Sequence, residues 1–270
     1  MTPAVAMTIA GSDSGGGAGI QADLKTFAAL GVFGTSAITA LTAQSTTEVR
    51  AVHVVPAPFV VTQIETVFDD LPVGAVKMGM LATAEIVAAV GELAADGRLP
   101  NLVVDPVMVA STGARLLDPE AEQRYVELLI PHARVVTPNV HEAEALLGSR
   151  IRTLAEQRDA AKAIAHHGPE VVVVKGGHAV EDTPDEAVDV VVAGGELHEL
   201  RAPRIGTTHD HGTGCTFAAA IAAHLALGDE PLNAVHAAKA FVHEAMGRST
   251  RWQLGAGHGP LDHLGWRRAG

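Results

Sequence analysis

The strongest constraint on the fold of this chain is an alternation between short, mostly apolar runs and longer segments with helical spacing. The clearest apolar run is the four-valine stretch 171–174, and residues 5–10 and 101–105 are similar. Short continuous apolar runs are typical of strands that are buried on both faces, as in parallel sheets covered by helices. The pattern therefore predicts an α/β fold, a three-layer sandwich with a mainly parallel central sheet.

The end of the chain departs from this alternation. Residues 188–193 and 197–200 read as two strands joined by Gly194, Gly195 and Glu196, which is typical of a hairpin. Two alanine-rich segments follow, over about 213–227 and 232–249, and both are expected to be helices. An antiparallel hairpin is thus predicted beside the parallel strands.

Length and composition favour a single domain over residues 1–270. The hydrophobic fraction is 47% and the mean hydropathy is +0.22, which is enough apolar material for a full core. No Pro/Gly/Ser-rich linker and no internal repeat divides the sequence. The residues from about 255 to 270 carry several Gly and His, and we expect them to form a loosely attached C-terminal tail.

Charge and cysteine content exclude several classes of function. The chain has 19 Lys and Arg against 31 Asp and Glu, for a formal charge of −12, and it has no basic run. Nucleic-acid binding needs clustered basic side chains, so it is not expected. The one cysteine, Cys215, rules out an internal disulfide framework and a cysteine-rich metal site.

Targeting signals are not evident in the sequence. The N-terminus has no basic region ahead of its apolar stretch, unlike a secretory signal. The longest apolar stretches, such as 217–227, fall short of the roughly 18 residues that a spanning helix needs. We therefore expect a cytoplasmic protein that does not bind membranes.

Ligands of open α/β sheets bind beyond the carboxyl ends of the strands, so the residues that follow each apolar run are the candidates for a site. A glycine-rich loop at 11–19 follows the first run and lets backbone approach a ligand closely. Position 20 is Ile, so the loop lacks the dinucleotide fingerprint, and the chain contains no Walker A sequence. The alternative is a flexible turn before a helix.

Gln44 follows the second predicted strand. Its amide offers one acceptor and two donors, which suits a heterocycle with an amino group beside a ring nitrogen. A surface loop glutamine is the alternative.

Acidic and amide side chains follow two later strands. Asp105, ahead of Pro106, stands at the sheet edge where a cation would lie. Asn139 and Glu142 have the spacing of a helix capping box. The same Glu142 is also able to hold a water on Mg²⁺, because Mg²⁺ keeps several waters and takes one or two carboxylates.

A lysine and a glycine-rich helix start are the last two candidates for the site. Lys175, followed by Gly176 and Gly177, is placed to reach a phosphate, although a surface lysine is the alternative. Residues 212–216, Gly-Thr-Gly-Cys-Thr, open an alanine-rich helix, where free N–H groups and the helix dipole favour an anion. Cys215 at this position is expected to have a depressed pKa and to act as a thiolate or through a shared proton, unless it is a small core cysteine.

These motifs together resemble the ribokinase-like small-molecule kinases, and specifically the bacterial hydroxymethylpyrimidine/phosphomethylpyrimidine kinases of thiamine biosynthesis. The resemblance runs from Thr8 to about Arg251, and its specificity comes from the order and spacing of the motifs. The segments that carry it are 10–25, 42–45, 77–80, 105–108, 137–142, 175–177 and 212–216.

The resemblance implies a fold, an activity and an assembly. The fold is a three-layer α/β/α sandwich, usually dimeric. ATP phosphorylates the hydroxymethyl group of 4-amino-5-hydroxymethyl-2-methylpyrimidine, and the same site then converts the monophosphate to the diphosphate. The cofactors implied are ATP and Mg²⁺, and the partners are the small pyrimidine and a second copy of the chain.

The resemblance also implies roles for individual residues. Gln44 would bind the aminopyrimidine, in a pocket lined by Gly11, Asp23, Met80 and Val107. Asp105 and Glu142 would lie near Mg²⁺, with Glu142 acting directly or through water. The residues implied on the nucleotide side are Asn139, Lys175 and Gly177. The catalytic residues implied are Lys175 and an anion hole of Gly212, Thr213, Gly214 and Cys215, with Cys215 where sugar kinases have an Asp base.

One local departure and three alternatives remain. The family often has Asn-Thr-His before the Gly-Thr-Gly-Cys motif, whereas this chain has His209, Asp210 and His211. The nearest alternative is a pyridoxal or pyridoxine kinase of the same fold. A sugar or nucleoside kinase is disfavoured by Cys215. A catalytically silent ligand-binding relative is disfavoured by the intact motifs.

Overall fold

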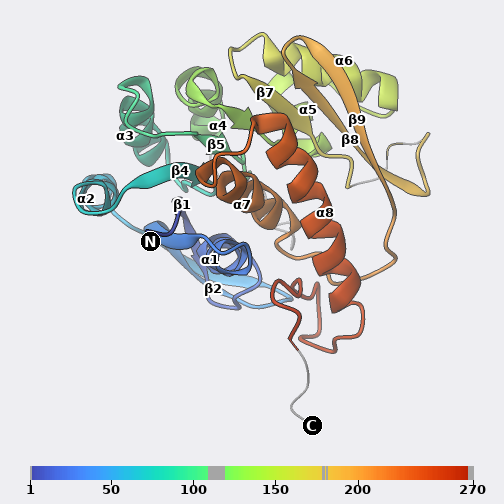
Figure 1. Cartoon of the computed structure of the whole chain (residues 1–270), viewed down its shortest axis with the longest axis horizontal. Coiled ribbons are helices and arrows are strands. Elements are labelled where there is room, and N and C mark those ends of the chain that lie inside the picture. Colours follow the sequence, from blue (N-terminus) through green and yellow to red (C-terminus); the bar gives the residue numbers. More distant parts are fainter. Residues whose placement is uncertain (1, 109–118, 178–179, 181, 267–270) are drawn as a thin grey trace.

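The computed structural model describes residues 2–108, 119–177, 180 and 182–266. Within these residues a single sheet runs in the strand order β3-β2-β1-β4-β5-β6-β7-β8-β9 (Figure 1). The strands are β1 (Val5–Asp13), β2 (Phe33–Gln44), β3 (Val49–Val54), β4 (Val73–Met78), β5 (Val103–Val104), β6 (Val135–Val136), β7 (Val171–Val174), β8 (Glu186–Ala193) and β9 (Glu196–Pro203).

The central part of the sheet is parallel, as the sequence predicts. β1 pairs in parallel with both β2 and β4, and the parallel pairing continues from β4 to β7. β8 and β9 form the predicted antiparallel hairpin at one edge. The carboxyl ends of β1, β2, β4, β5, β6 and β7 therefore lie along the same edge of the sheet.

Helices cover both faces of the sheet and complete the three layers (Figure 1). α1, α7 and α8 pack on one face, and α2 to α6 pack on the other. The helices are α1 (Gly19–Ala29), α2 (Ala57–Phe68), α3 (Ala84–Ala95), α4 (Pro119–Leu128), α5 (Val140–Leu147), α6 (Leu154–Ala165), α7 (Thr213–Ala226) and α8 (Pro231–Ser249). No helix in the described part of the chain has the length and apolar character to cross a membrane.

β7 shows why a continuous apolar run marks a central strand. Val171 and Val173 pack against the α7 and α8 side, whereas Val172 and Val174 pack against α5 and α6. All four are buried, at 2% exposure or less. Complete burial of a valine contributes roughly 1.5–3 kcal/mol, so this strand anchors both helical layers.

α7 is the helix on which the site is built, and its composition allows it to lie close to the sheet. Its residues from Phe217 to Ala223 are all buried, and most of them are alanine. Small side chains let the helix axis approach α1, α8 and the strands beneath it. The low aromatic content of the chain, 3%, is consistent with such a core of small residues.

One strand was not predicted from the sequence. β3 pairs antiparallel with β2 at the open edge of the sheet, and its residues are mostly exposed. The exposed apolar side chains Leu41, Val52 and Val54 lie on this pair of strands. Because both faces of β3 meet solvent, it lacks the buried pattern that marks the central strands.

The C-terminal segment differs from the loose tail that was expected. Leu261, Asp262 and His263 are buried, at 3% exposure or less. Nε2 of His263 lies 2.9 Å from the hydroxyl of Thr216 in α7. Apolar burial and this polar contact hold residues 259–263 against the body of the domain, and residues 267–270 lie outside the described part.

Candidate active site

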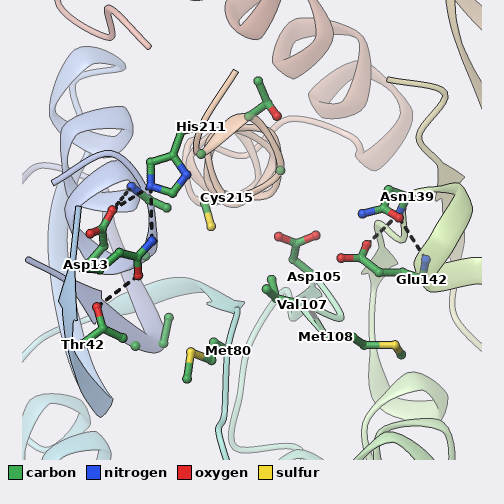
Figure 2. Close-up of a pocket in the computed structure, with 18 of the residues that line it drawn as sticks. Asp13, Thr42, Met80, Asp105, Val107, Met108, Asn139, Glu142, His211 and Cys215 are labelled. Atoms are coloured by element: carbon green, nitrogen blue, oxygen red, sulfur yellow. Dashed lines mark hydrogen bonds and ion pairs between the residues drawn. The ribbon is translucent and has the colours of Figure 1, made fainter. Parts of the chain in front are cut away.

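A cavity of about 500 Å³ lies beyond the carboxyl ends of the parallel strands and beside the first turn of α7 (Figure 2). The strand ends, the loops that follow them and the first turns of α5 and α7 supply its walls. The residues that line it and bear on function are Gly11, Asp13, Thr42, Gln44, Lys77, Met80, Asp105, Val107, Asn139, Glu142, Lys175, His211, Gly212, Thr213, Gly214 and Cys215.

The start of α7 is built from glycines for steric reasons. Gly212 is the N-cap residue, with φ of 86°, a left-handed conformation that favours glycine. A Cβ there would lie 2.0 Å from the carbonyl oxygen of Gly17. A Cβ on Gly214 would lie 3.2 Å from Nζ of Lys175. The two glycines thus let a helix N-terminus, which favours anions, reach the cavity wall.

Lys175 and Asp105 form an ion pair at this end of the cavity. Nζ of Lys175 lies 2.7 Å from Oδ1 of Asp105, which also accepts a bond of 3.2 Å from the Thr137 hydroxyl. The Asp105 side chain is 1% exposed and that of Lys175 is 13% exposed. The pair places one cation and one carboxylate beside the helix start, and Lys175 is therefore not the surface lysine of the alternative interpretation.

Asn139 and Glu142 form the predicted capping box at the start of α5. Oδ1 of Asn139 accepts from the Glu142 N–H at 2.9 Å, and Oε2 of Glu142 accepts from the Asn139 N–H at 2.7 Å. Burial raises the pKa of Glu142, Lys175 lowers it, and Asp105 raises it further, to about 7. The capping box thus holds a second carboxylate at the same wall of the cavity as Asp105.

Two carboxylates that repel one another across one wall suit a hard divalent cation. The charge of Asp105 contributes to the raised pKa of Glu142, and a cation between the two would relieve this repulsion. Mg²⁺ takes one or two carboxylates and completes its shell with waters and substrate phosphates. Among the described residues no cluster of three or more His, Cys, Asp or Glu could hold a metal alone. The donor set therefore fits Mg²⁺ shared with a nucleotide.

Cys215 lies in the first turn of α7 and borders the cavity, but it is not the thiolate that was expected. Burial raises the pKa of the thiol, and the nearby charges of Asp23 and Asp105 raise it further, to about 11. Lys77 and a hydrogen bond from the Gly19 backbone lower the pKa without reversing the effect of burial. Desolvation therefore outweighs the helix terminus, and Cys215 is a thiol at neutral pH.

Behind Cys215 lies a buried ion pair that sequence analysis did not predict. Nζ of Lys77 is 2.8 Å from Oδ2 of Asp23, and Oδ2 also accepts a 2.6 Å bond from the Thr8 hydroxyl. Both charged side chains are fully buried. The motif 77–80 was recognised, but only the pairing of β4 with β1 shows that Lys77 points into the interior beside the cavity.

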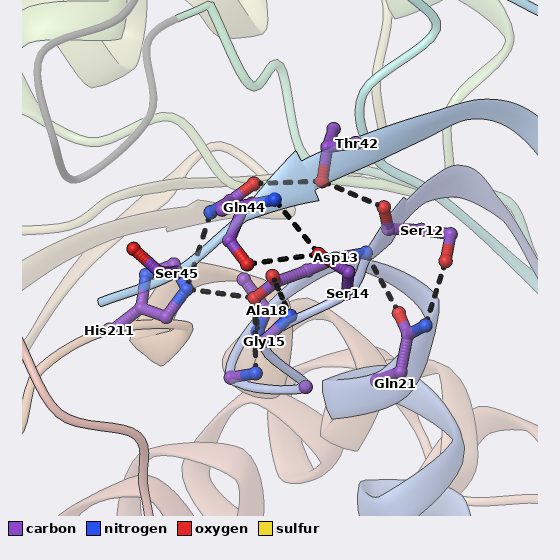
Figure 3. Close-up of polar contacts among 12 residues, drawn as sticks. Ser12, Asp13, Ser14, Gly15, Ala18, Gln21, Thr42, Gln44, Ser45 and His211 are labelled. Carbon is purple, nitrogen blue, oxygen red and sulfur yellow. Dashed lines mark hydrogen bonds and ion pairs between the residues drawn. The ribbon is translucent and has the colours of Figure 1, made fainter. Parts of the chain in front are cut away.

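The opposite end of the cavity is formed by Gln44 and a tight turn at residues 13–18 (Figure 3). The Asp13 carboxylate accepts from the backbone N–H groups of Gly15, Gly17 and Ala18, at 2.8–3.0 Å. It also lies 2.9 Å from Nε2 of His211. The glycine-rich loop is therefore an ordered turn closed by its own aspartate, and not the flexible turn of the alternative interpretation.

Comparison with known proteins identifies the family. A family model described as phosphomethylpyrimidine kinase matches residues 13–262. The hydroxymethylpyrimidine/phosphomethylpyrimidine kinase of Rhizobium meliloti is 51% identical over 263 residues, which cover 97% of each chain. This chain belongs to the phosphomethylpyrimidine kinase family.

Solved structures of relatives share the fold of this family member. A phosphomethylpyrimidine kinase from Clostridium difficile superposes with a TM-score of 0.78 at 42% identity, over 89% of this chain and 98% of that one. A pyridoxal kinase from Bacillus subtilis, solved with ADP, gives a TM-score of 0.89 at 38% identity, over 97% and 98%. The ribokinase-like three-layer fold is thereby confirmed for this kinase.

Most of the predicted site residues of this family member line the cavity. Two of them lie outside it. Asp23 is fully buried behind Lys77 and does not line the wall. Gly177 is exposed, and its carbonyl accepts a bond from Arg204 at 2.7 Å. The predicted residues that do line the cavity are Gly11, Gln44, Met80, Asp105, Val107, Asn139, Glu142, Lys175 and residues 212–215.

The residues that depart from the usual family pattern have partners of their own. His209 is buried and its Nε2 lies 2.9 Å from the carbonyl oxygen of Trp252. Asp210 Oδ1 lies 2.6 Å from Nδ1 of His258 at the mouth of the cavity. Both contacts reach the part of the chain that follows α8, so these two residues hold residues 252–258 beside the site.

Proposed function

We propose that this chain transfers phosphoryl groups from ATP to 4-amino-5-hydroxymethyl-2-methylpyrimidine and then to its monophosphate, in thiamine biosynthesis. The printed names of the most similar relatives support this activity, and the ADP found with the Bacillus subtilis structure supports ATP as donor. The observation that carries the proposal is one cavity with Gln44 at one end, the Lys175–Asp105 pair at the other, and the glycine-lined start of α7 beside both.

The roles of the residues at the transfer end follow from the chemistry. Phosphoryl transfer depends on positioning and on stabilisation of charge, with little covalent chemistry for the protein. We assign the backbone N–H groups of residues 212–215 to the transferred phosphoryl group, with Lys175 as the nearby cation. Asn139 borders this end of the cavity beside Lys175, and we assign both to the nucleotide. Loss of one such donor typically costs roughly 10²–10³ in rate.

We assign Cys215, which lines the cavity, to accept the proton of the hydroxymethyl oxygen. A thiolate accepts a proton and a thiol does not, so the small thiolate fraction set by a pKa of about 11 limits this step at neutral pH. Lys77, buried beneath, favours the thiolate through its charge. In the second phosphorylation the acceptor is a phosphate oxygen, which is already ionised and needs no base.

Mg²⁺ is proposed at Asp105 and Glu142. When bound, it would neutralise charge on the phosphates of the nucleotide. Both residues must be ionised to hold it, and the raised pKa of Glu142, about 7, makes the ionisation of this carboxyl group sensitive to pH near neutrality. The Asn139 backbone N–H donates to Oε2 of Glu142 in the capping box, so the position of this carboxylate is fixed before any cation arrives.

Two further properties belong to the proposal. We propose a homodimer, in which the exposed apolar side chains Leu41, Val52, Val54 and Phe59 on β2, β3 and α2 are the candidate contact. Such exposed apolar residues at a sheet edge are suited to association. We also propose a cytoplasmic location, where ATP is available to a metabolic kinase.

Pyridoxal phosphorylation is the second candidate activity, because a specific observation favours it. The pyridoxal kinase of Staphylococcus aureus, solved with pyridoxal, superposes on this chain with a TM-score of 0.88 at 36% identity. Pyridoxal also carries a hydroxymethyl group on an aza-aromatic ring, so the same transfer geometry would serve it.

The proposal is tested by ADP release with ATP, Mg²⁺ and either hydroxymethylpyrimidine or pyridoxal, compared side by side. We expect kcat/KM to be higher for the pyrimidine, and we expect the same mixture without a second substrate to release little ADP. Faster turnover of pyridoxal than of the pyrimidine would transfer the assignment to the second candidate.

A further inference from the structure

The side-chain amide of Gln44 stands between two polar groups of the cavity wall (Figure 3). Its Oε1 lies 3.1 Å from the hydroxyl oxygen of Thr42, and its Nε2 lies 3.5 Å from Nε2 of His211. The orientation of the amide decides whether a ligand meets its donor or its acceptor at each position. This orientation can be inferred from the groups to which Thr42 and His211 donate their protons.

The proton of Thr42 has a partner other than Gln44. The hydroxyl lies 3.0 Å from the backbone carbonyl oxygen of Ser12 and 3.1 Å from Oε1 of Gln44, and we assign its one proton to the shorter contact, with a carbonyl oxygen that only accepts. A hydroxyl has one proton and two lone pairs, so Thr42 then has acceptor capacity left for Gln44. If the amide oxygen faced Thr42, two acceptors, Oε1 and the hydroxyl oxygen, would lie together. An amide N–H in the same place would donate a hydrogen bond to the hydroxyl oxygen.

The proton of His211 is fixed by Asp13. Burial alone would raise the pKa of Asp13, but the bonds from His211 and from the backbone of Ala18 and Gly15 outweigh it and hold this pKa below its usual value. The carboxylate accepts only, so Nε2 of His211, 2.9 Å away, must carry a proton. An amide nitrogen facing the same Nε2 would place two donors together.

The backbone of Gln44 is held, so the amide has little other freedom. The N–H of Gln44 lies 2.8 Å from the Ser14 hydroxyl oxygen, and that hydroxyl lies 2.9 Å from the Gln44 carbonyl oxygen. A 180° rotation about the Cγ–Cδ bond exchanges the amide oxygen and nitrogen without moving the backbone. After this rotation the amide donates to Thr42 and accepts from His211.

We propose that Thr42 and the Asp13–His211 pair fix the Gln44 amide with Nε2 toward Thr42 and Oε1 toward His211, and thereby select the aminopyrimidine over pyridoxal. The inference rests on the proposed function and adds the determinant of its substrate class. Nε2 donates one proton to Thr42 and presents the other to the cavity. Oε1 receives a weak share of the His211 proton and presents a lone pair to the cavity.

The resulting order matches the substituents of the substrate. His211 is adjacent to Gly212 in the chain, so the acceptor end of the amide is the end nearer the start of α7. The amino group of the pyrimidine neighbours its hydroxymethyl group, and the ring nitrogen lies beyond the amino group. With the hydroxymethyl group at α7, the amino donor meets Oε1 and the ring nitrogen meets Nε2.

Pyridoxal presents the opposite chemistry at the decisive position. The two ring carbons beside the one that bears its hydroxymethyl group carry an aldehyde and a hydrogen, so neither offers Oε1 an N–H donor, and the aldehyde oxygen would face it as a second acceptor. A site that hydrogen-bonds one substrate disfavours an analogue that leaves its polar groups unpaired. Thr42 and His211 are therefore positioning residues, which act on the substrate through Gln44.

Binding by calorimetry without ATP tests this inference separately from turnover. The variants are Thr42→Val, which loses the hydroxyl, and Thr42→Ser, which keeps it. For Thr42→Val we expect the affinity for hydroxymethylpyrimidine to fall roughly five- to tenfold, the effect of one hydrogen bond. The affinity for pyridoxal should not fall, KM for ATP should be unchanged, and Thr42→Ser should keep the wild-type preference.

The matched control is Thr35→Val. Thr35 lies on the same strand, and its hydroxyl donates to the β1 carbonyl of Ala6 at 3.2 Å, as Thr42 does to Ser12. Thr35 lies at the other end of this strand from Gln44, so the preference should stay at the wild-type value. An unchanged preference in Thr42→Val, or an equal loss in both variants, would overturn the inference.

Two outcomes separate this inference from the proposed function. If the wild-type protein binds the pyrimidine and releases no ADP, the proposed function fails and the affinity ratios still decide the inference. If Thr42→Val does not fold, neutron diffraction from the deuterated wild-type protein decides it, because deuterium marks the amide nitrogen. Deuterium on the atom that faces Thr42 is expected, and deuterium on the atom that faces His211 would overturn the inference.

Discussion

Lys77 and Asp23 form an ion pair of 2.8 Å in which neither side chain has exposed surface. The second carboxylate oxygen of Asp23, Oδ1, has no hydrogen-bond partner among the described residues. The pair joins β4 to α1, and both of its charges affect the pKa of Cys215. A buried pair of this kind is costly to form and more costly to break, because removal of one partner strands the other charge.

Lys77→Met should therefore destabilise the protein by about 3–5 kcal/mol, measured as the free energy of unfolding in urea. The double variant Lys77→Met with Asp23→Asn should recover part of this loss, because no buried charge is left unpaired. The exposed pair of Arg98 and Glu65, at 3.0 Å, gives the control. Arg98→Met should cost less than about 1 kcal/mol, and an equal cost at both sites would contradict this account.

The reactivity of the thiol can be read directly, because Cys215 is the one cysteine in the sequence. With a pKa of about 11, its alkylation by iodoacetamide should accelerate about tenfold for each pH unit from 7 to 10. A folded Lys77→Met variant should react more slowly at each pH, since Lys77 lowers this pKa. A rate that levels off below pH 9 would show a thiolate and contradict the effect assigned to burial.

Cys215→Ala should affect the two phosphorylations unequally. The first step should slow by roughly 10²–10⁴, the usual contribution of a general base. The second should slow less, since a phosphate oxygen needs no deprotonation. The measurement is ADP release with hydroxymethylpyrimidine and with its monophosphate, and the affinity for the pyrimidine serves as the control for an intact pocket. Equal losses in both steps would remove Cys215 from the role of base.

Glu142→Gln should stabilise the protein in a pH-dependent way. The carboxyl pKa is raised from 4.5 to about 7 in the folded state, so folding takes up a proton and the ionised form is disfavoured. The contribution of Glu142 to the free energy of unfolding is therefore lost as pH rises from about 4.5 to 7. The melting temperature of the variant should equal that of the wild type near pH 4.5 and exceed it above pH 7.

The amide that replaces the carboxylate in the Glu142→Gln variant still has an oxygen to accept from the Asn139 N–H, so the capping box is retained. The same variant should lose activity, because an amide is a poor ligand for Mg²⁺ compared with a carboxylate. A variant that is less stable than the wild type at pH 8 would contradict the burial effect on Glu142.

Those features of the fold that rest on local patterns could be predicted from the sequence. The four valines of β7 are buried on both faces, as their continuous run indicates. The capping box of Asn139 and Glu142 depends on two residues three positions apart, and the structure contains it. β3 was missed, because an exposed edge strand has neither an alternating nor a continuous apolar pattern.

The site was predictable in position but not in its electrostatics. Strand ends indicated where Asp105, Lys175 and Gln44 would lie. The depressed pKa predicted for Cys215 was wrong, because helix-terminus arguments omit the desolvation that the tertiary structure imposes. Lys77 carried no signal of its own, since its direction depends on the pairing of β4 with β1.

The most direct test of the account is phosphorus NMR of the wild-type protein with ATP, Mg²⁺ and hydroxymethylpyrimidine. We expect a monophosphate ester to appear first and a diphosphate to replace it, with ADP formed in each step. ADP without a phosphorylated pyrimidine, or a phosphate ester on pyridoxal alone in a competition between the two substrates, would contradict the assignment of this cavity to the pyrimidine.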